Sequence, residues 1–548
     1  MLGVVAGGST ILPRVAASPI RSNGPAQAVQ PPPSTWDYTA DVVVLGTGFA
    51  GLSAAMTAYN TGASVIVLEK MDKTRQGGNS IVAGNEVWAP LDVVQGALYI
   101  NACNMGRVDD PDLPMLISQG LQENLQVLTN LGITYGLSAI GPANPGLIGA
   151  STVKFYVMTY NNLQFSGGAG IWYPLRQALA KLEGSNLKFM YSTPATSLIQ
   201  DPLTNEILGV TAASSDGTLN VKANRGVVLA CGGFEYNKDM LAQYLPTSEL
   251  LQWGTPGNTG DGIKMAQAVG ADLWHMQQQN WGTPDAMKTP YGPATTISVK
   301  GNNYIFVDRT GSRYVNESSG FGSYGYPGWE IAMYFDRPTE SFIRNPTWAI
   351  FDETSRKAGA MLSPSTAPPG GFPSGLKYGG WFGNFSGYTW SSDNSAEIAS
   401  GWIFSASSIA NLASLLTADP DNTNSATGQL LMNPTTLQAT VTRWNSLVSG
   451  GADTDFGRPT ATMGAIQTPP FYAAKLWIGF NNTEGGPKRN KNCQVLDTTG
   501  TPIPRLYSAG ELGSFYGMLY NGGGNIGECL FTGRMAGNNA AHETPSTS

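Results

Sequence analysis

The chain has 548 residues, of which 41% are hydrophobic and only 13% are charged, and its formal net charge is −7. A chain of this length is too long for a single hydrophobic core, which predicts two or three domains. The acidic balance argues against nucleic acid as a partner, since such a protein needs a basic face, and no apolar run is long enough for a transmembrane helix.

Cysteine and histidine are scarce. Cys103, Cys231, Cys493 and Cys529 form no C-x-x-C pair, which excludes an iron–sulfur cluster or c-type haem held by local spacing. The chain has only 2 histidines, so mechanisms that need a histidine cluster are disfavoured. We expect no metal site.

Residues 1–36 do not belong to the predicted fold. Small apolar residues followed by Val15-Ala16-Ala17 resemble the apolar part and cleavage site of an export signal, but the charged segment before them is missing. A truncated leader of the twin-arginine type and a disordered extension of a cytoplasmic protein are both open interpretations.

The first element of the predicted fold is a β-α-β unit. Residues 41–45 form a short run rich in Val, which is typical of a buried parallel strand. A glycine-rich turn follows, then a helical segment at 52–61 closed by Gly62, and a second apolar strand at 63–68. This order predicts a right-handed crossover onto a parallel sheet.

The turn in this unit carries a dinucleotide-binding pattern. Gly46, Gly48 and Gly51 follow the first strand and open the helix, and Glu69 ends the second strand. The glycines allow a tight turn, close approach to a pyrophosphate and close helix packing, and the acid accepts hydrogen bonds from ribose hydroxyls. The residues assigned to the cofactor here are Gly46, Gly48, Phe49, Ala50, Gly51, Glu69 and Lys70.

Later segments complete the predicted organisation. We expect a helix at 173–182, strands at 187–191, 207–212, 219–223 and 225–230, helices near 405–417 and 434–449, and a last helix at 526–541. From about residue 290 to 466 the chain becomes rich in Gly, Pro, Ser, Asn and aromatic residues, which predicts a second domain.

Three further glycine-rich segments favour FAD over NAD. They lie at 76–80, 229–234 and 506–511, and a nicotinamide site does not need contributions from all three. The residues assigned to the flavin cofactor from these segments are Gly77, Gly78, Asn79, Ser80, Gly232, Gly510 and Glu511.

Collinear motifs from about residue 38 to 541 resemble the fumarate reductase/3-ketosteroid dehydrogenase superfamily. Besides the segments above, they are Asn258-Thr-Gly-Asp-Gly262, Gly311-Ser-Arg-Tyr-Val-Asn-Glu317, Trp348-Ala-Ile-Phe-Asp352, Asp455-Phe-Gly-Arg458 and Gly522-Gly-Gly-Asn525. The resemblance adds Asp261, Asn525 and Ile526 to the cofactor site. It implies hydride transfer between flavin N5 and a C–C bond next to a carbonyl.

The resemblance also implies the fold class. It is α/β (α+β overall), with a Rossmann-type FAD-binding domain interrupted by an inserted α+β capping or catalytic domain. The expected boundaries are 1–36 for the leader or extension, 37–285 and 467–541 for the two parts of the FAD-binding domain, 286–466 for the inserted domain, and 542–548 for a tail.

Two departures from the fumarate reductase pattern bear on the substrate. Fumarate reductases hold a dicarboxylate with a His-His-Thr segment and an Arg, where this chain has Asn481-Asn-Thr and Tyr520-Asn-Gly-Gly-Gly-Asn525. Two carboxylates would then lack cationic partners, which is costly. The second segment is similar to Tyr-Pro-Gly-Pro-Gly of 3-ketosteroid dehydrogenases, which implies that Tyr520 and Gly524 bind a ketone oxygen and stabilise an enolate.

The proton carrier is less well defined. Where ketosteroid dehydrogenases have a Tyr, this chain has Phe321, and we assign the role to the nearby Tyr326, with Tyr324 close by and an aromatic wall residue as the alternative. Arg356 matches the proton-donating Arg of fumarate reductases, and a salt-bridging Arg is the alternative. Tyr516 is a further candidate.

Attachment of FAD is expected to be non-covalent, because Gln76 stands where succinate dehydrogenases have a linking His. Three functions are compatible with the sequence. The first is a dehydrogenase of a 3-ketosteroid or similar hydrophobic ketone. The second is an exported reductase of an organic enone that receives electrons from an external donor. The Asn-Thr-x-Gly-Gly-Pro segment at 482–487 resembles that of such reductases. The third is a flavin-binding protein without turnover.

Overall fold

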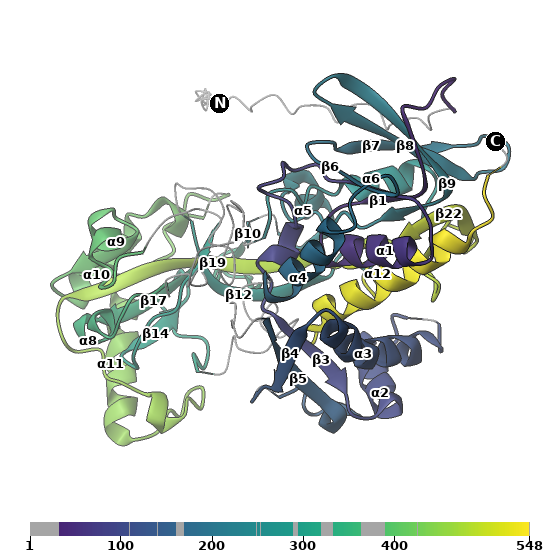
Figure 1. Cartoon of the computed structure of the whole chain (residues 1–548). Coiled ribbons are helices and arrows are strands. Elements are labelled where there is room, and N and C mark those ends of the chain that lie inside the picture. The colour runs from purple at the N-terminus through teal and green to yellow at the C-terminus, as the bar shows by residue number, and fades with distance from the viewer. Residues whose placement is uncertain are drawn as a thin grey trace, which may run out of the picture.

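The computed structural model describes residues 32–546 except 109, 140, 161–168, 248, 253, 289–293, 319–332, 363–389 and 425. Figure 1 shows two lobes, one built from both ends of the chain and one from its green middle region. Within the described ranges, no helix is long and apolar enough to cross a membrane.

The sheet of the larger lobe joins strands from both ends of the chain. Its order is β21 (Gln494–Leu496), β22 (Pro502–Ser508), β9 (Gly217–Leu229), β1 (Tyr38–Leu45), β2 (Val65–Leu68) and β6 (Leu187–Met190). All neighbours from β22 to β6 are parallel. Strands β7 (Ala195–Gln200) and β8 (Ile207–Ser214) extend β9 as an antiparallel meander. The strands predicted at 219–223 and 225–230 are one strand, β9, because it pairs with β8 at its start and with β1 almost throughout.

Helices cover both faces of this sheet, because β1 and β2 are buried on both sides. One face packs against α1 (Phe49–Asn60), α4 (Ala169–Ala180) and α12 (Gly524–His542), and the other against α5 (Lys238–Tyr244) and α6 (Asp261–Ala268). Helix α12 lies along α1. A Cβ on Gly537 would stand 2.7 Å from Ala54 Cα, so glycine permits this close packing.

A small sheet lies beside α12 in the same lobe. It consists of β3 (Glu86–Pro90), β5 (Val153–Tyr160) and β4 (Ile133–Leu137), and it is flanked by α2 (Val93–Asn104) and α3 (Leu113–Asn130). The short helices η1 (Gly78–Ile81) and η2 (Ala150–Thr152) precede β3 and β5. Helix α3 contacts α12, so this unit supports the start of the last helix.

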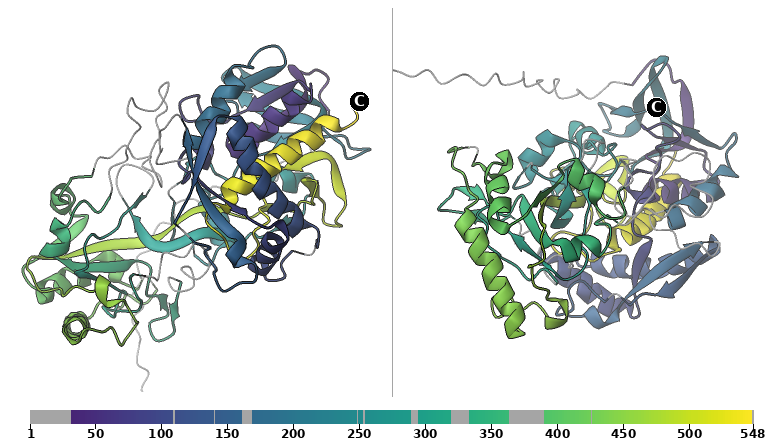
Figure 2. Two further views of the ribbon diagram at one scale, coloured as in Figure 1. Left: turned by 60° about the horizontal axis from the view of Figure 1, so that its bottom comes forward. Right: turned by 90° about the vertical axis from the view of Figure 1, so that its left-hand side faces the viewer.

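Strand β19 (Phe471–Thr483) links the two lobes. Figures 1 and 2 show it running from the outer lobe into the larger one. It pairs with β17 (Thr347–Asp352) and β18 (Ile403–Ala406) at its start and with β12 (Gln279–Met287) and β10 (Leu251–Gln252) at its end. The last residues of β19 therefore reach the larger lobe.

The remaining elements are short or lie in the outer lobe. The outer lobe adds β14 (Tyr304–Val307), α8 (Glu353–Lys357), α9 (Ser395–Ala399), α10 (Ile409–Thr417) and α11 (Pro434–Gly450). The others are β11 (Leu273–Trp274), β13 (Thr295–Thr296), β15 (Phe335–Asp336), β16 (Ser341–Phe342), β20 (Gly486–Pro487), η4 (Pro420–Asn422) and η5 (Thr460–Thr462).

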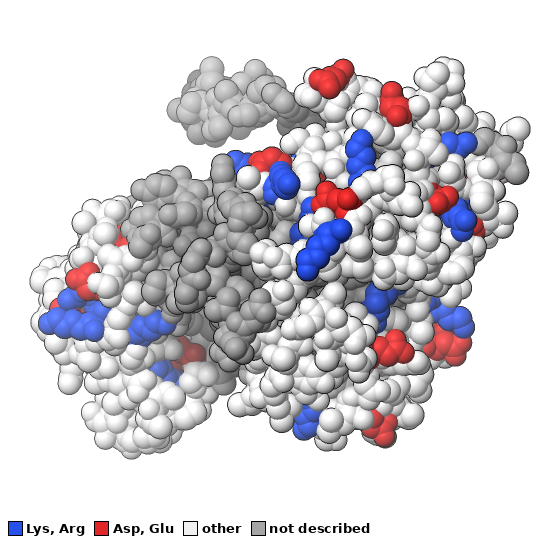
Figure 3. Space-filling view, in the orientation of Figure 1, with Lys and Arg blue, Asp and Glu red and all other residues white. Residues whose placement is uncertain are grey.

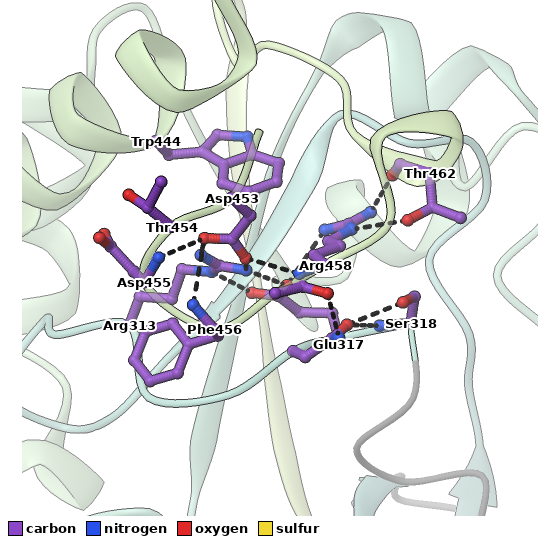
Figure 4. Close-up of polar contacts among 12 residues, drawn as sticks. Arg313, Glu317, Ser318, Trp444, Asp453, Thr454, Asp455, Phe456, Arg458 and Thr462 are labelled. Atoms are coloured by element: carbon purple, nitrogen blue, oxygen red, sulfur yellow. Dashed lines mark hydrogen bonds and ion pairs between the residues drawn. The ribbon is translucent and has the colours of Figure 1, made fainter. Parts of the chain in front are cut away.

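A buried ion-pair network holds the outer lobe together. Arg313 Nε lies 2.8 Å from Glu317 Oε1 and Arg313 Nη2 lies 2.8 Å from Asp453 Oδ2, while Arg458 Nη1 lies 3.2 Å from Glu317 Oε2. Figure 4 shows these four side chains converging beside Trp444. Two cations face two anions, so the charges are balanced. We call this set the paired cluster.

The surface seen in Figure 3 is mostly neutral. Lys, Arg, Asp and Glu are scattered over both lobes, and on the described part of this face neither sign forms a continuous patch. This agrees with the low charged fraction of 13%.

Candidate functional site

A first cavity, enclosing about 840 Å³ of space that includes open solvent, lies at the carboxyl ends of β1, β2 and β9. In an open α/β sheet this edge is where ligands bind. The predicted cofactor residues that line it are Gly46, Gly48, Phe49, Ala50, Glu69, Lys70, Gly78, Asn79, Ser80, Gly232, Asp261, Gly510 and Glu511. Gly51 and Gly77 do not line it.

The glycines of the first turn have steric reasons to be glycine. Gly46 has φ +108°, and a Cβ there would stand 2.3 Å from the Ala230 carbonyl oxygen. A Cβ on Gly51 would stand 2.0 Å from Gly46 O. Gly51 therefore acts by allowing α1 to pack on the turn rather than by contacting a ligand.

The start of α1 is only partly available to a phosphate. The Phe49 N–H donates to Ser80 Oγ at 2.9 Å, so one of the first N–H groups is already bound. Gly77, also predicted as a contact residue, has φ +103° and donates its N–H to Thr47 Oγ1 at 2.9 Å. Ser80 and Gly77 thus connect the second glycine-rich loop to the first turn.

Glu69 lies at the cavity in a bonded arrangement. Its Oε1 accepts from the Met71 N–H at 2.8 Å, and its Oε2 accepts from the N–H and hydroxyl of Thr47. Burial raises the pKa of this carboxyl despite these donors. Lys70 forms an ion pair with Asp261 at 2.7 Å across the cavity rim. Sequence reasoning missed Thr47, a variable position of the glycine motif.

A second cavity, of about 810 Å³ including open solvent, adjoins the first. The two share Phe49, Asn79, Ser80, Glu511 and Cys529 as lining residues. The predicted cofactor residues Asn525 and Ile526 line only the second cavity. A ligand in the first cavity would therefore reach residues that also line the second.

The lining of the second cavity combines apolar groups with polar side chains that are mostly neutral. It includes the amides of Asn79, Asn280, Asn481, Asn482 and Asn525. Its acids are Glu86 and Glu511, and the described residues around it include no Lys, Arg or His. This environment is suited to an uncharged polar ligand rather than to an anion.

Tyr520 faces the second cavity and is 4% exposed. Its hydroxyl oxygen accepts a hydrogen bond from the Asn525 N–H at 3.2 Å, at the start of α12. Gly524 does not line the cavity, and its N–H donates to the Asn521 carbonyl at 2.9 Å. The Tyr516 ring packs edge-on against Tyr520, with ring centroids 5.7 Å apart.

One predicted proton carrier lies apart from this site, and the other lies outside the described residues. Arg356 is in α8, donates to Glu353 at 2.6 and 2.8 Å and to the Asp393 carbonyl at 2.8 Å, and lines neither cavity. These contacts agree with the alternative interpretation of Arg356 as a salt-bridging residue. Tyr326, with Phe321 and Tyr324, lies outside the described residues.

Three glutamates that face one another were missed by sequence reasoning or assigned only to cofactor contact. Glu235 and Glu484 are 0% and 1% exposed, and Glu511 is half-buried where the two cavities meet. We call Glu235, Glu484 and Glu511 the acid cluster. A signal did exist, since Glu235 and Glu484 are charged residues inside Gly-rich segments of a chain that is only 13% charged.

The protons of the acid cluster are held tightly. Burial raises the pKa of Glu235, and burial together with the nearby Glu235 and Glu484 raises that of Glu511. Burial and the neighbouring Glu528 raise the pKa of Glu484 to about 8. Among the residues that the structure places, no group of His, Cys, Asp and Glu is arranged to hold a metal ion.

Comparison with known proteins identifies the family. A family model described as an FAD binding domain matches residues 41–526. The chain belongs to this FAD-binding family. It is similar to a digoxin reductase of Eggerthella lenta, with 28% identity over 100% of this chain and 96% of the relative. It is 26% identical to a fumarate reductase (cytochrome) of Shewanella frigidimarina over 92% of this chain and 77% of that protein.

A solved structure shares the fold. The 3-ketosteroid Δ1-dehydrogenase of Sterolibacterium denitrificans, in complex with 1,4-androstadiene-3,17-dione, superposes with a TM-score of 0.73 at 23% identity and covers 92% of this chain and 99% of its own. The predicted membership of the fumarate reductase/3-ketosteroid dehydrogenase superfamily is confirmed. The protein is an FAD-dependent oxidoreductase with a mixed α/β fold of several sheets.

The residues of the first cavity fit the cofactor. The cavity follows a turn where side chains larger than hydrogen would clash at Gly46 and Gly51, and a buried acid stands at its far strand. A volume of several hundred Å³ is in the range of cofactor sites.

Proposed function

We propose that this enzyme moves a hydride between FAD and the carbon–carbon bond next to the carbonyl of a neutral, hydrophobic ketone, and that it dehydrogenates a 3-ketosteroid or a similar compound. FAD would lie non-covalently in the first cavity, held by the lining residues given above, with the ketone in the second. The predicted division, with residues 286–466 as a domain inserted between 37–285 and 467–541, is part of this proposal.

One observation carries the choice of a neutral ketone. The described lining of the second cavity lacks a cationic side chain and is instead rich in asparagine amides. A dicarboxylate there would have two charges without partners, whereas a ketone needs only hydrogen-bond donors.

Tyr520 is the proposed donor to the ketone oxygen. Its oxygen already accepts the Asn525 N–H at 3.2 Å, which orients the phenol and strengthens the O–H as a donor. The start of α12 adds a positive dipole end near the same point. Both effects stabilise negative charge on the ketone oxygen when the neighbouring carbon loses its proton.

Bound FAD would accept or supply the hydride. The chain's own contribution is to bind and polarise the ketone and to move one proton. Tyr326 remains the proposed proton carrier. The Gly524 N–H, proposed with Tyr520 for the ketone oxygen, would have to leave the Asn521 carbonyl before it could donate.

The test is an anaerobic visible spectrum of the FAD-loaded protein during addition of a saturated 3-ketosteroid. Bleaching of the oxidised flavin band is the expected result. Tyr520→Phe should lower the bleaching rate by about 100- to 1,000-fold, as loss of an oxyanion donor does. Tyr507→Phe removes a hydroxyl from another buried tyrosine that lines neither cavity, and it should leave the rate unchanged.

A second function has its own support. The similarity to a digoxin reductase extends over 100% of this chain, which favours reduction of an organic enone with electrons from an external donor. Reoxidation of the pre-reduced enzyme by an enone, without bleaching by the saturated ketone, would select this alternative. If neither reaction occurs, the ketone assignment is wrong while FAD binding stands.

A further inference from the structure

The acid cluster has an arrangement that neither cofactor binding nor ketone binding explains. Glu235 Oε1 accepts hydrogen bonds from Asn79 Nδ2 at 3.2 Å, Asn258 Nδ2 at 3.3 Å and the Thr483 N–H at 3.2 Å. Glu511 Oε1 accepts from the same two amides, at 3.4 Å from Asn79 and 3.1 Å from Asn258. The two carboxyls therefore share their donors.

This set of donors leaves one oxygen of the two carboxyls without a hydrogen bond. Glu235 Oε2 is buried and has no hydrogen-bond partner among the described residues. Like charges that face one another in a buried site hold a proton between them, because one negative charge is far cheaper than two. The shared amide donors and the unbonded oxygen therefore favour one proton on the pair.

The described groups around the pair supply no unbalanced positive charge. Glu484 faces Glu511, and its Oε1 accepts from Asn482 at 3.2 Å and from Asn525 at 2.9 Å. Glu528 lies near Glu484 and forms an ion pair with Arg489, so this arginine is not available to the pair. The Cys529 thiol also faces Glu511, and burial raises its pKa, so it is a neutral neighbour.

The position of the pair connects it to the cofactor. Asn79 and Glu511 line both cavities, so they stand where a bound FAD meets the space for its substrate. A negative charge added there increases the proton affinity of a nearby carboxylate.

We propose that Glu235 and Glu511 share one proton in the oxidised protein and take up a second proton from water when FAD is reduced. Two electrons and one proton convert FAD to its anionic reduced form, and one further proton converts the remaining carboxylate of the pair to a carboxylic acid. The pair thereby neutralises the charge that reduction places in a buried site. On reoxidation the second proton returns to water.

The test counts protons and needs no organic substrate. The FAD-loaded protein in weak buffer is reduced anaerobically by light with an artificial electron donor, and a pH-indicator dye reports proton uptake per flavin after subtraction of a protein-free control. Near neutral pH the wild type should take up about two protons per flavin, and uptake should fall toward one as the pH is raised to about 9 and the pair ionises. Uptake of one proton at every pH would overturn the proposal.

The residue test starts from Glu235→Gln, because Glu235 lines neither cavity. Glutamine at 235 has the shape of the protonated acid and leaves Glu511 to take up the second proton, so uptake in this variant should stay at about two. When Glu511→Gln is added, the pair has no carboxyl left to protonate, and uptake should fall to about one proton at neutral pH. Glu397→Gln alters a glutamate that is 0% exposed, lies in the outer lobe and lines neither cavity, and it should keep uptake at about two. Uptake of about two protons in the double variant Glu235→Gln/Glu511→Gln would contradict the proposal.

Two features keep this experiment interpretable. The flavin content of each variant is measured by its absorbance, and the spectrum of the reduced flavin distinguishes its anionic from its neutral form, so a second proton on the flavin itself would be seen and would count against the pair. The inference depends on bound FAD but not on the ketone assignment. A protein that takes up two protons yet fails to react with a ketosteroid would refute the proposed function and support the pair.

Discussion

Two of the buried groups of ionisable side chains in the described part of the molecule, the paired cluster and the acid cluster, are built on opposite principles. The paired cluster of Arg313, Glu317, Asp453 and Arg458 balances two cations with two anions. The acid cluster collects three carboxyls whose described hydrogen-bond partners are amides and backbone groups. In the paired cluster each buried charge is stabilised by a partner of opposite sign. In the acid cluster burial favours the protonated, uncharged form of the carboxyls.

The comparison shows that burial alone does not decide whether a buried carboxyl is protonated. Burial opposes the charge of Asp453, yet the hydrogen bonds from Arg313 and from the backbone N–H groups of Arg458 and Phe456 outweigh it and lower the pKa of Asp453. In the acid cluster burial is the largest cause and no cation among the residues that the structure describes opposes it, so the pKa values rise. A perturbed pKa at a cavity wall is the pattern of a functional site, and a fully paired network is the pattern of a structural one.

The largest effect is expected from breaking the paired cluster. Arg458→Met should destabilise the outer lobe by about 3–5 kcal/mol, because it leaves Glu317 buried with one cation instead of two. Urea unfolding followed by tryptophan fluorescence measures this, and Trp444, whose ring centroid lies 5.1 Å from the Arg458 guanidinium carbon, is one of the 13 tryptophans that contribute. A loss below about 1 kcal/mol, the range of an exposed pair, would mean that the paired cluster is not structural.

The two clusters should give stability opposite dependences on pH. The acid-cluster carboxyls bind protons more tightly in the folded chain than their ordinary pKa near 4.5, so stability falls as pH rises from about 4.5 to about 8, by up to about 1.4 kcal/mol per pH unit for each group. The lowered pKa of Asp453 contributes stability above about pH 4 that is lost as pH falls further. Unfolding midpoints across this range measure both trends.

Glu484→Gln sharpens this prediction. Glutamine has the shape of the protonated acid and does not titrate, so the decline in stability between about pH 5 and about pH 8 should become shallower. An unchanged slope would show that Glu484 ionises normally in the folded protein.

The smallest effect is expected at an exposed ion pair of the outer lobe. Arg443 donates to Asp455 at 2.8 Å beside the paired cluster, but its side chain is 56% exposed. Arg443→Met should therefore cost about 0–1 kcal/mol in the same unfolding experiment. A cost equal to that of Arg458→Met would show that burial is not what separates the paired cluster from a surface pair.

Local patterns were sufficient for the cofactor-binding turn and for several helices of both lobes. The β-strand, glycine turn and helix at 41–61 form as predicted, because each depends on residues that are neighbours in sequence. The helices predicted near 405–417, 434–449 and 526–541 are α10, α11 and α12. The family followed from the same motifs and their order.

The substrate side depended on contacts between distant segments. The sequence predicted Tyr520 as a ketone-binding residue. It did not predict that the Tyr520 hydroxyl accepts from the Asn525 N–H or that the Gly524 N–H is already bonded, because both contacts depend on the turn before α12. Arg356 matched a motif position, yet its guanidinium is bound by Glu353 and Asp393 in the outer lobe.

The sequence by itself determined the cofactor, the family and the order of the main elements, because glycine spacing, apolar runs and cap residues act over short stretches of chain. Only the tertiary structure decided which charges meet. Glu235 and the Thr483 N–H that it accepts are separated by 248 residues, and Arg313 and Asp453 by 140 residues. Whether a buried acid finds a cation or another acid depends on folding, and that difference separates the structural cluster from the one proposed to take part in redox chemistry.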